Sequence, residues 1–183
     1  MSLEADNRQL EARTEELQRD TLEDPLTRLG NRRRVDEELP RILARARDSA
    51  QPLCRAVADL DHFKRANDRF GHGVGDKVLR AVSHLFRAKT RTNDLLARTG
   101  GEEFLFVFVD TPLDTACDIC ERLRDSIEDQ PWGEVVPALV VTLSLGLCTA
   151  ELEGTTQRLL DCADAALYAA KRSGRNRVWV NAA

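Results

Sequence analysis

The sequence lacks any long apolar segment. No apolar run approaches the roughly 20 residues that a membrane-spanning helix needs, and the stretch 1–20 is strongly polar, without the apolar core of a signal peptide. We therefore expect no membrane contact from this segment. The expected location is cytoplasmic, either as such or as the cytoplasmic part of a larger, membrane-tethered protein.

The sequence also lacks an excess of basic residues. Its formal net charge is -4, which argues against a nucleic acid polymer as a partner, because such binding needs a clearly basic face. The chain has 183 residues, of which 42% are hydrophobic and 32% are charged. This balance is typical of one globular domain with some extra length.

A convincing cysteine framework is missing as well. The cysteines are odd in number and scattered, at positions 54, 117, 120, 148 and 162. Cys117 and Cys120 form a CxxC pair, but it lies in a helical pattern with no second pair and no histidine nearby, which makes zinc or redox chemistry a poor interpretation. We expect all of these side chains to be small buried hydrophobic groups.

Residues 1–23 contain neither glycine nor proline. Leu3, Leu10 and Leu17 recur at a spacing of seven, which favours a short helix with a coiled-coil-like seam. Such a helix is either a solvated leader or a stalk that promotes dimerisation. Asp24-Pro25 breaks it, so we predict a linker helix over 1–23 and a separate folded domain over 24–183.

Hydrophobic periodicity predicts alternating helices and strands in the rest of the chain. Asn31 is expected to cap a first helix, and Thr155 or Thr156 a last one that Gly174 ends. Between and after these come, in order, a strand over 53–60, a short helix from Phe63 that ends before Gly71, a helix over 75–87, a β-hairpin of 95–98 and 104–109, a helix opened by Pro112, and strands over 138–147 and 177–180. This order fits an α+β fold with an antiparallel or mixed central sheet.

Carboxylates gather where strands are expected to end. Asp59 and Asp61 close the first strand, and Glu102-Glu103 lies in or just after the hairpin turn. Carboxylates at neighbouring strand ends repel one another unless a cation neutralises them, and hard oxygen ligands suit Mg²⁺ or Mn²⁺. Without further context, ordinary surface charge explains them equally well.

Other residues suit phosphate groups. Gly100-Gly101 allows a ligand to approach the backbone closely, and Phe63-Lys64 places backbone N–H groups at a helix start. Lys171 and Arg175 lie four apart at the end of the last predicted helix. They could meet the same phosphates, or simply be cations at a helix C-terminus.

Four motifs, in order and at the expected spacing, together resemble the GGDEF family of diguanylate cyclase domains. The run from Arg98 to Phe104 is similar to the family signature in its GGEEF form. The runs 24–32 (DPLTRLGNR), 59–76 (DLDHFKRANDRFGHGVGD) and 165–176 (AALYAAKRSGRN) resemble its opening motif, its metal- and guanine-binding segment and its closing motif. The resemblance covers about residues 24–180 and implies a palm-like, mostly antiparallel five-stranded sheet flanked by helices.

The resemblance also implies a role for each matching residue. It implies that Asp59, Glu102 and Glu103, with the backbone carbonyl of Leu60, hold two Mg²⁺ or Mn²⁺ ions per active site. GTP would be bound by Asn67 and Asp76 at the guanine edge and otherwise by Phe63, Lys64, Gly100, Gly101, Lys171 and Arg175. Asp61 is expected to be structural, and His62 replaces an aromatic residue that is frequent in the family.

The implied reaction joins two GTP molecules into cyclic di-GMP and two pyrophosphates. Each family member binds one GTP, so the implied enzyme works as a homodimer, and an upstream sensory or receiver domain is expected before residue 1. The main alternative is a catalytically weak or inactive module that binds cyclic di-GMP or GTP. Another nucleotidyl cyclase or polymerase-like enzyme, and an adaptor that dimerises through 1–23, explain the motifs less well.

A second site is expected upstream of the hairpin. Arg91 and Asp94 resemble the family's RxxD inhibitory site, separated from Gly100 by the five residues 95–99. The resemblance implies feedback inhibition by bound cyclic di-GMP, with Arg122 as a secondary arginine. An ordinary surface Arg–Asp pair is the alternative.

Overall fold

The computed structural model describes residues 22–150 and 156–181. The heptad leucines of the predicted linker helix and Thr155 lie outside this part. The helices are α2 (Arg32–Asp48), α3 (Phe63–Phe70), α4 (His72–Lys89), α5 (Leu113–Glu128) and α6 (Thr156–Arg172), with a 3₁₀ turn at Trp132–Glu134. The strands are β1 (Leu53–Leu60), β2 (Leu95–Arg98), β3 (Glu103–Val109), β4 (Leu143–Thr149) and β5 (Val178–Asn181).

The strands of the described residues form one five-stranded sheet in the order β2-β3-β1-β4-β5. The pairs β2–β3, β3–β1 and β1–β4 are antiparallel, and only β4–β5 is parallel. The predicted α+β class with a mostly antiparallel sheet is therefore confirmed. Among the described helices, none is long and apolar enough to cross a membrane.

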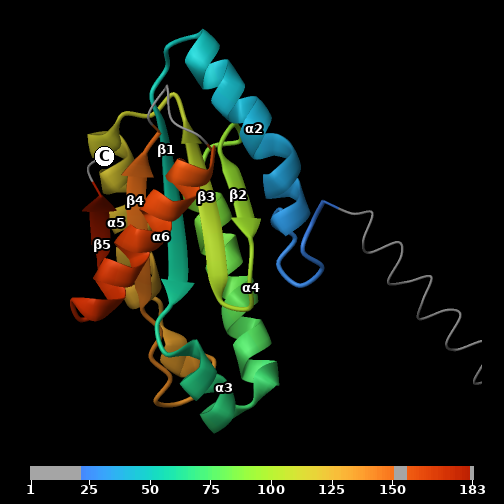
Figure 1. The fold of residues 1–183 in the computed structure, drawn as a ribbon. Coiled ribbons are helices and arrows are strands. Elements are labelled where there is room, and N and C mark those ends of the chain that lie inside the picture. The colour runs from blue at the N-terminus through green and yellow to red at the C-terminus, as the bar shows by residue number, and fades with distance from the viewer. Residues whose placement is uncertain (1–21, 151–155, 182–183) are drawn as a thin grey trace, which may run out of the picture.

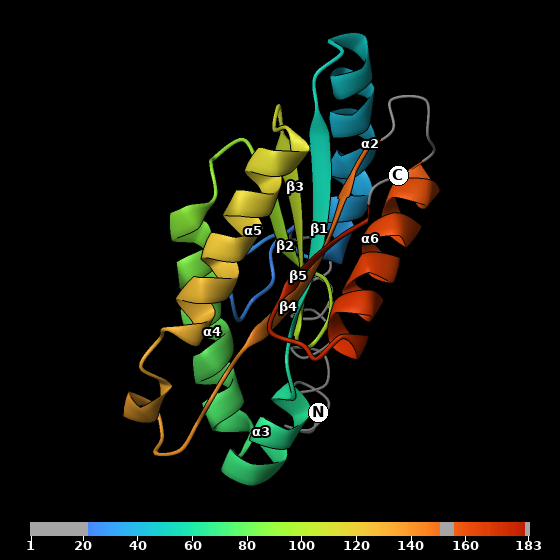
Figure 2. The same cartoon turned by 90° about the vertical axis from the view of Figure 1, so that its left-hand side faces the viewer.

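The sheet lies between two layers of helices. Figure 2 shows α4 and α5 on one face and α2 and α6 on the other. In Figure 1, α3 lies beyond the lower end of the sheet, next to the end of β1 and below the β2–β3 turn. This end of the sheet therefore brings together segments that carry several of the predicted site residues.

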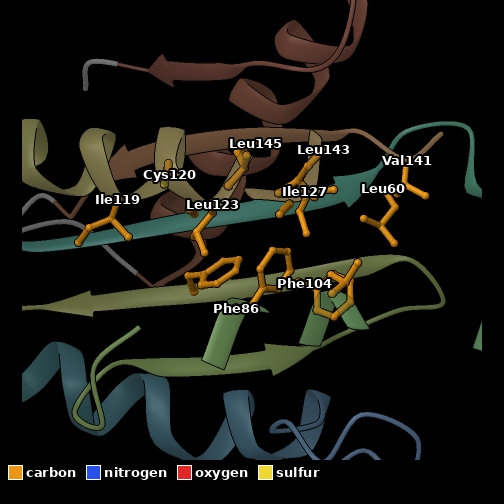
Figure 3. Close-up of a cluster of buried hydrophobic side chains, with 14 of the residues drawn as sticks. Leu60, Phe86, Phe104, Ile119, Cys120, Leu123, Ile127, Val141, Leu143 and Leu145 are labelled. Carbon is orange, nitrogen blue, oxygen red and sulfur yellow. The ribbon is translucent and has the colours of Figure 1, made fainter. Parts of the chain in front are cut away.

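Each face of the sheet has its own hydrophobic core. The α4–α5 side holds Phe86 and Phe104 (Figure 3). Phe86 packs edge-to-face on both Phe104 and Phe106, with ring centroids 5.1 Å away in each case. Leu123 and Ile127 of α5 are fully buried in the same cluster. Strand β1 is buried along its whole length, so its end is held rigidly where the site is built.

Helix starts and ends follow local sequence signals. The Asn31 side chain accepts a hydrogen bond from the Arg34 N–H at 3.0 Å and caps α2, as predicted. Helix α4 begins at His72 and ends at Lys89, a few residues beyond the predicted limits at both ends. Such differences at helix ends are ordinary.

The predicted strand over 138–147 is wrong in its first half, because β4 begins only at Leu143. Leu143 pairs with Leu60, the last residue of β1. One more bond follows, from the Asp61 N–H to the Thr142 carbonyl at 2.9 Å, and residues 138–141 then have no partner strand for a ladder among the described residues. Leu139 and Val141 are buried while Val140 is 77% exposed. This alternation of buried and exposed residues is the pattern by which a strand is predicted. Burial periodicity without a hydrogen-bonding neighbour does not make a strand.

The expectation for the cysteines is wrong for two of them. Cys148 at the end of β4 and Cys162 on α6 form a disulfide, with Cα atoms 6.1 Å apart. Packing of α6 on β4 brings the two cysteines together, which their spacing in the sequence does not reveal. Cys54 and Cys120 are buried free thiols, as expected, and Cys117 is half-buried.

Candidate active site at the end of the sheet

The candidate site is built on the ends of two neighbouring strands. Asp59 of β1 lies directly opposite Glu103, the first residue of β3, in the antiparallel register. The Leu60 N–H donates to the Glu102 carbonyl at 3.2 Å, which holds the hairpin turn against the end of β1. The three predicted carboxylates Asp59, Glu102 and Glu103 are thus brought to one edge of the sheet.

Lys171 reaches this edge from the last turn of α6. Its Nζ lies 2.9 Å from Oδ2 of Asp59, whose side chain is only 7% exposed. Burial raises the pKa of Asp59, and the charge of Glu103 adds to the rise, while Lys171 opposes it. Burial also raises the pKa of Glu102, with the charge of Asp59 as the next cause. Both shifts mark a site that an additional cation would stabilise.

The glycine turn is shaped by Arg98. Its guanidinium donates to the Gly101 carbonyl at 2.8 and 3.2 Å and forms an ion pair with Asp24 at 3.1 Å. A Cβ on Gly100 would lie 2.6 Å from Oε2 of Glu103, so glycine leaves room for that carboxylate. Arg98 thus ties the opening motif of the domain to the turn that carries the acidic residues.

A nucleotide-sized hollow of about 490 Å³ lies beside this turn. Its walls include Asn67 and Asp76, predicted to bind guanine, and Glu102 and Gly101 of the turn. Phe63 and Lys64, predicted to meet phosphates, also line it. The structure therefore joins the predicted guanine and phosphate residues to one of the acidic residues in a single cavity.

Asn67 is held in an unusual state within this hollow. Its Oδ1 atom is buried and has no hydrogen-bond partner in the described part of the chain. A Cβ on Gly75 would lie 1.9 Å from that atom, so only glycine at this position of α4 admits the Asn67 side chain. An acceptor kept without a partner is costly unless a ligand donates to it.

The remaining phosphate candidates are less closely grouped. Lys171 lines a second hollow of about 440 Å³, with Glu103 and Thr99, on the side of the sheet that α2 and α6 cover. Arg175 follows α6 in a turn and lines neither this hollow nor the one at Asn67. Its backbone is left-handed, with φ of 64°.

The carboxylates suit a divalent ion by their chemistry, although their side chains do not converge on one point. In the described ranges, no three His, Cys, Asp or Glu side chains are grouped as a metal site. Asp59, Glu102 and Glu103 nevertheless supply hard oxygen donors with raised pKa values at two of them. The donor set fits Mg²⁺ or Mn²⁺, with the Lys171 ammonium neutralising Asp59 in this structure.

The predicted inhibitory residues do not form a single group. Arg91 and Asp94 line a hollow of about 300 Å³ together with Arg28, Arg34 and Arg87. The Asp94 carboxylate accepts from the N–H groups of Arg91, at 3.0 Å, and Val109, at 3.2 Å, so it holds the turn before β2. Arg122 is exposed on α5 and is not part of this hollow.

Two residues shape the site although the sequence motifs assigned them no function. Arg98 is only part of the signature, yet it fixes the turn. Gly75 is only a predicted helix start, yet it makes room for Asn67. An arginine next to a glycine pair is a signal that sequence analysis could have used, whereas the meeting of Gly75 and Asn67 depends on how α3 and α4 pack.

Comparisons with known proteins agree with this geometry. Residues 21–177 match the family described as diguanylate cyclase, GGDEF domain. The chain is 39% identical over 179 residues to diguanylate cyclase DgcP of Pseudomonas aeruginosa, covering 98% of this chain and 27% of DgcP. It is 40% identical over 163 residues to response regulator PleD of Caulobacter vibrioides, covering 87% of this chain and 36% of PleD.

A solved structure of a GGDEF domain also resembles this chain. The coiled coil and GGDEF domain of DgcB from Caulobacter crescentus, in complex with c-di-GMP, superposes with a TM-score of 0.83 at 33% identity, covering 96% of this chain and 94% of that one. The chain spans about a quarter to a third of the length of the curated relatives DgcP and PleD. From the match over most of its length, this chain belongs to the GGDEF family of diguanylate cyclase domains.

Proposed function

We propose that the chain is an active diguanylate cyclase domain that condenses two GTP molecules into cyclic di-GMP and two pyrophosphates. The observation that carries this proposal is the hollow whose walls include both Asn67, with its buried and unpartnered Oδ1, and Glu102. A purine that donates hydrogen bonds suits the first group, and a charged phosphate chain with its cation suits the second.

Guanine is favoured over adenine by the donors it offers. Asn67 and Asp76 both line the hollow, and their side-chain oxygens are acceptors suited to the N1–H and amino group of guanine, whereas adenine lacks the N1–H. A site with buried acceptors rejects a base that leaves them unpaired. Phe63 and Lys64 line the same hollow, where α3 begins and where we place the phosphate chain.

Asp59, Glu102, Glu103 and the Leu60 carbonyl would hold two Mg²⁺ or Mn²⁺ ions. When bound, such ions polarise the α-phosphate and lower the pKa of the attacking 3′-hydroxyl. Lys171 pairs with Asp59 in the structure, so we expect its ammonium to turn toward the triphosphate as the cations bind. Lys171 and Arg175 would then hold the β- and γ-phosphates.

The reaction needs two such sites that face each other. The 3′-hydroxyl of one GTP loses its proton to water as its oxygen forms a bond to the α-phosphorus of the other, the α–β phosphoanhydride bond breaks, and pyrophosphate leaves. A second step with the two nucleotides in exchanged roles closes the ring. Since each domain offers one guanine hollow at this edge, the acting species is a homodimer, in which positioning supplies most of the acceleration.

We assign dimer promotion to the linker helix of residues 1–23. The DgcB structure is described as a coiled coil with a GGDEF domain, and the spacing of Leu3, Leu10 and Leu17 predicts a similar element in residues 1–23 of this chain. Leu10→Glu should lower the specific activity at low protein concentration. Ala12→Glu introduces the same charge outside the seam and should have a smaller effect; equal effects of the two would refute the role of the seam.

Feedback inhibition by cyclic di-GMP is proposed for the hollow at Arg91. The arginines around it can bind phosphate or the guanine edge in fork geometry. Arg91→Ala should relieve product inhibition while leaving the initial rate unchanged. Inhibition that persists in this variant would show that the site lies elsewhere.

The deciding experiment incubates the purified chain with GTP and Mg²⁺ over a range of protein concentrations and separates the products by chromatography. Cyclic di-GMP should form at a rate that rises more steeply than linearly with protein. Glu103→Gln should abolish it, whereas Glu134→Gln, at an exposed glutamate of the 3₁₀ turn, should not. If no product forms while cyclic di-GMP binds tightly and Arg91→Ala abolishes that binding, the chain is a product receptor instead.

A further inference from the structure

Asp61 connects three segments at the end of the sheet. It follows β1 directly and is 7% exposed. Its Oδ1 accepts from the Ser144 hydroxyl at 2.6 Å, and its Oδ2 accepts from the Thr142 hydroxyl at 2.7 Å and from the Asn176 N–H at 3.0 Å. One carboxylate therefore joins the end of β1 to the start of β4 and to the turn that follows α6.

The turn after α6 needs such support. Arg175 and Asn176 are consecutive non-glycine residues with φ of 64° and 46°. The left-handed conformation is unfavourable for residues with a Cβ and persists only where the surroundings impose it. The Arg175 N–H is bonded to the Ala170 carbonyl at 3.1 Å, which closes the end of α6 but does not hold Asn176.

Asn176 is instead held from two sides. Its backbone N–H is bound by Asp61, and its side chain is bound by α5, with Oδ1 accepting from Arg124 at 3.1 Å and Nδ2 donating to Glu128 at 2.9 Å. Its backbone position is therefore set by the end of β1, the strand that also carries Asp59. Arg175, the preceding residue, is thus fixed between two anchors, its own N–H on the Ala170 carbonyl and the next residue, Asn176, on Asp61.

We propose that Asp61 is a positioning residue for the triphosphate of GTP, and that it acts through Asn176 to fix the backbone from which the Arg175 side chain departs. Asp61 itself is occupied by its three donors, so we assign it no direct contact with substrate or metal. The inference rests on the proposed function in one respect only, the assignment of Arg175 to the β- and γ-phosphates. It adds that the Arg175 turn is aligned to Asp59 by a direct link along β1.

Ser144 offers a matched control. It is fully buried and bonds the same carboxylate, but at Oδ1 and from β4, so its loss leaves the link from Oδ2 to Asn176 intact. Asp61→Asn, by contrast, keeps the side-chain size but replaces one acceptor oxygen by an NH₂ group. Because all three partners are donors, this change disturbs the link to Asn176. Asn176→Gly keeps the backbone N–H and tolerates positive φ, and provides a second variant that tests the turn without altering Asp61.

The experiment measures binding of GTP and of GMP by calorimetry, the KM and kcat for GTP, and the Tm of each variant. Asp61→Asn should weaken GTP binding and raise KM about 10-fold, with GMP binding changed less than about 2-fold, because GMP has no β- or γ-phosphate. Ser144→Ala should lower Tm without changing KM. Asn176→Gly should keep GTP affinity within a few-fold of the parent, since its link to Asp61 remains.

A double-mutant cycle decides the route of the effect. In an Arg175→Ala background, Asp61→Asn should weaken GTP binding by less than about 2-fold, because the group that it positions is already gone. Additive losses, or equal weakening of GTP and GMP, would overturn the inference while leaving the proposed function intact. A parent chain that binds GMP and GTP equally would overturn both, since no residue would then recognise the triphosphate.

Discussion

The ammonium nitrogen of Lys171 lies 2.9 Å from Oδ2 of Asp59, which joins the last turn of α6 to the end of β1. Asp59 is almost fully buried, whereas the Lys171 side chain is 32% exposed. The pair therefore supplies charge neutralisation to a buried carboxylate from a side chain that retains freedom to move. Removing the lysine should accordingly leave a buried charge that another cation can neutralise.

Lys171→Met should destabilise the metal-free protein and make it more dependent on divalent cations. Removing one partner of a mostly buried ion pair leaves the other uncompensated, and we expect a loss of about 1–2 kcal/mol after allowing for the exposure of the lysine. Thermal unfolding with and without Mg²⁺ should show a larger Mg²⁺-induced rise of Tm in this variant than in the parent. Lys77→Met, at an exposed position of α4, is the control; a Mg²⁺ shift equal to that of the parent would count against a shared site.

Gly75→Ala should impair guanine binding, whereas Gly73→Ala should not. A Cβ at Gly75 would meet Asn67 Oδ1 at 1.9 Å, but a Cβ at Gly73, in the same helix, has no neighbour within 4 Å. We expect Gly75→Ala to lower GTP affinity at least about 10-fold and to reduce discrimination against ATP. Gly73→Ala, in the first turn of α4, should leave both the stability and the GTP affinity close to those of the parent. Titrations of both variants with GTP and ATP, together with denaturant unfolding, check these expectations. If Gly75→Ala still prefers GTP over ATP as strongly as the parent does, Asn67 is not part of the guanine site.

Reduction of the Cys148–Cys162 disulfide should lower the thermal stability. The bond closes a loop with a sequence separation of 14, and closure of about 15 residues corresponds to about 3 kcal/mol in the chain-entropy account. For a domain of this size, that equals a fall in Tm of about 6–12 °C. Scanning calorimetry with and without a reducing agent measures it. Cys162→Ser should abolish the response to reductant, while Cys117→Ser, at a free thiol, should retain it.

Asp24 should make folding stability depend on pH in the acid range. Burial by itself would raise the pKa of Asp24, but hydrogen bonds from Thr27 and the charge of Arg98 outweigh it, so the net pKa lies below the usual 3.8. The unfolded chain therefore binds a proton more readily, and the stabilisation is present above about pH 4 and is lost as the pH falls through the lowered pKa.

Denaturant unfolding between about pH 2.5 and pH 6 measures this dependence. Asp24→Asn should give a flatter profile at its acid end than the parent. Asp114→Asn, at an exposed aspartate of α5, should reproduce the parent profile. Parallel profiles for Asp24→Asn and the parent would mean that Asp24 contributes nothing to acid sensitivity.

Elements with local signals could be predicted from the sequence. The apolar run 53–60 and the glycine pair between two short apolar runs predicted β1 and the β2–β3 hairpin correctly, because strand and turn signals lie within a few residues. Asn31 likewise marked the start of α2. The ordered motifs determined the family, since residue identities at fixed spacing need no coordinates.

Contacts between residues far apart in the chain could not be predicted in this way. The strand order, the disulfide between Cys148 and Cys162, and the room that Gly75 makes for Asn67 all depend on how helices pack on the sheet or on one another. The same holds for β4, which starts at Leu143 because β1 ends opposite it. A short apolar run indicates that a segment is buried. Packing of the whole domain determines which segments share backbone hydrogen bonds and which distant side chains meet.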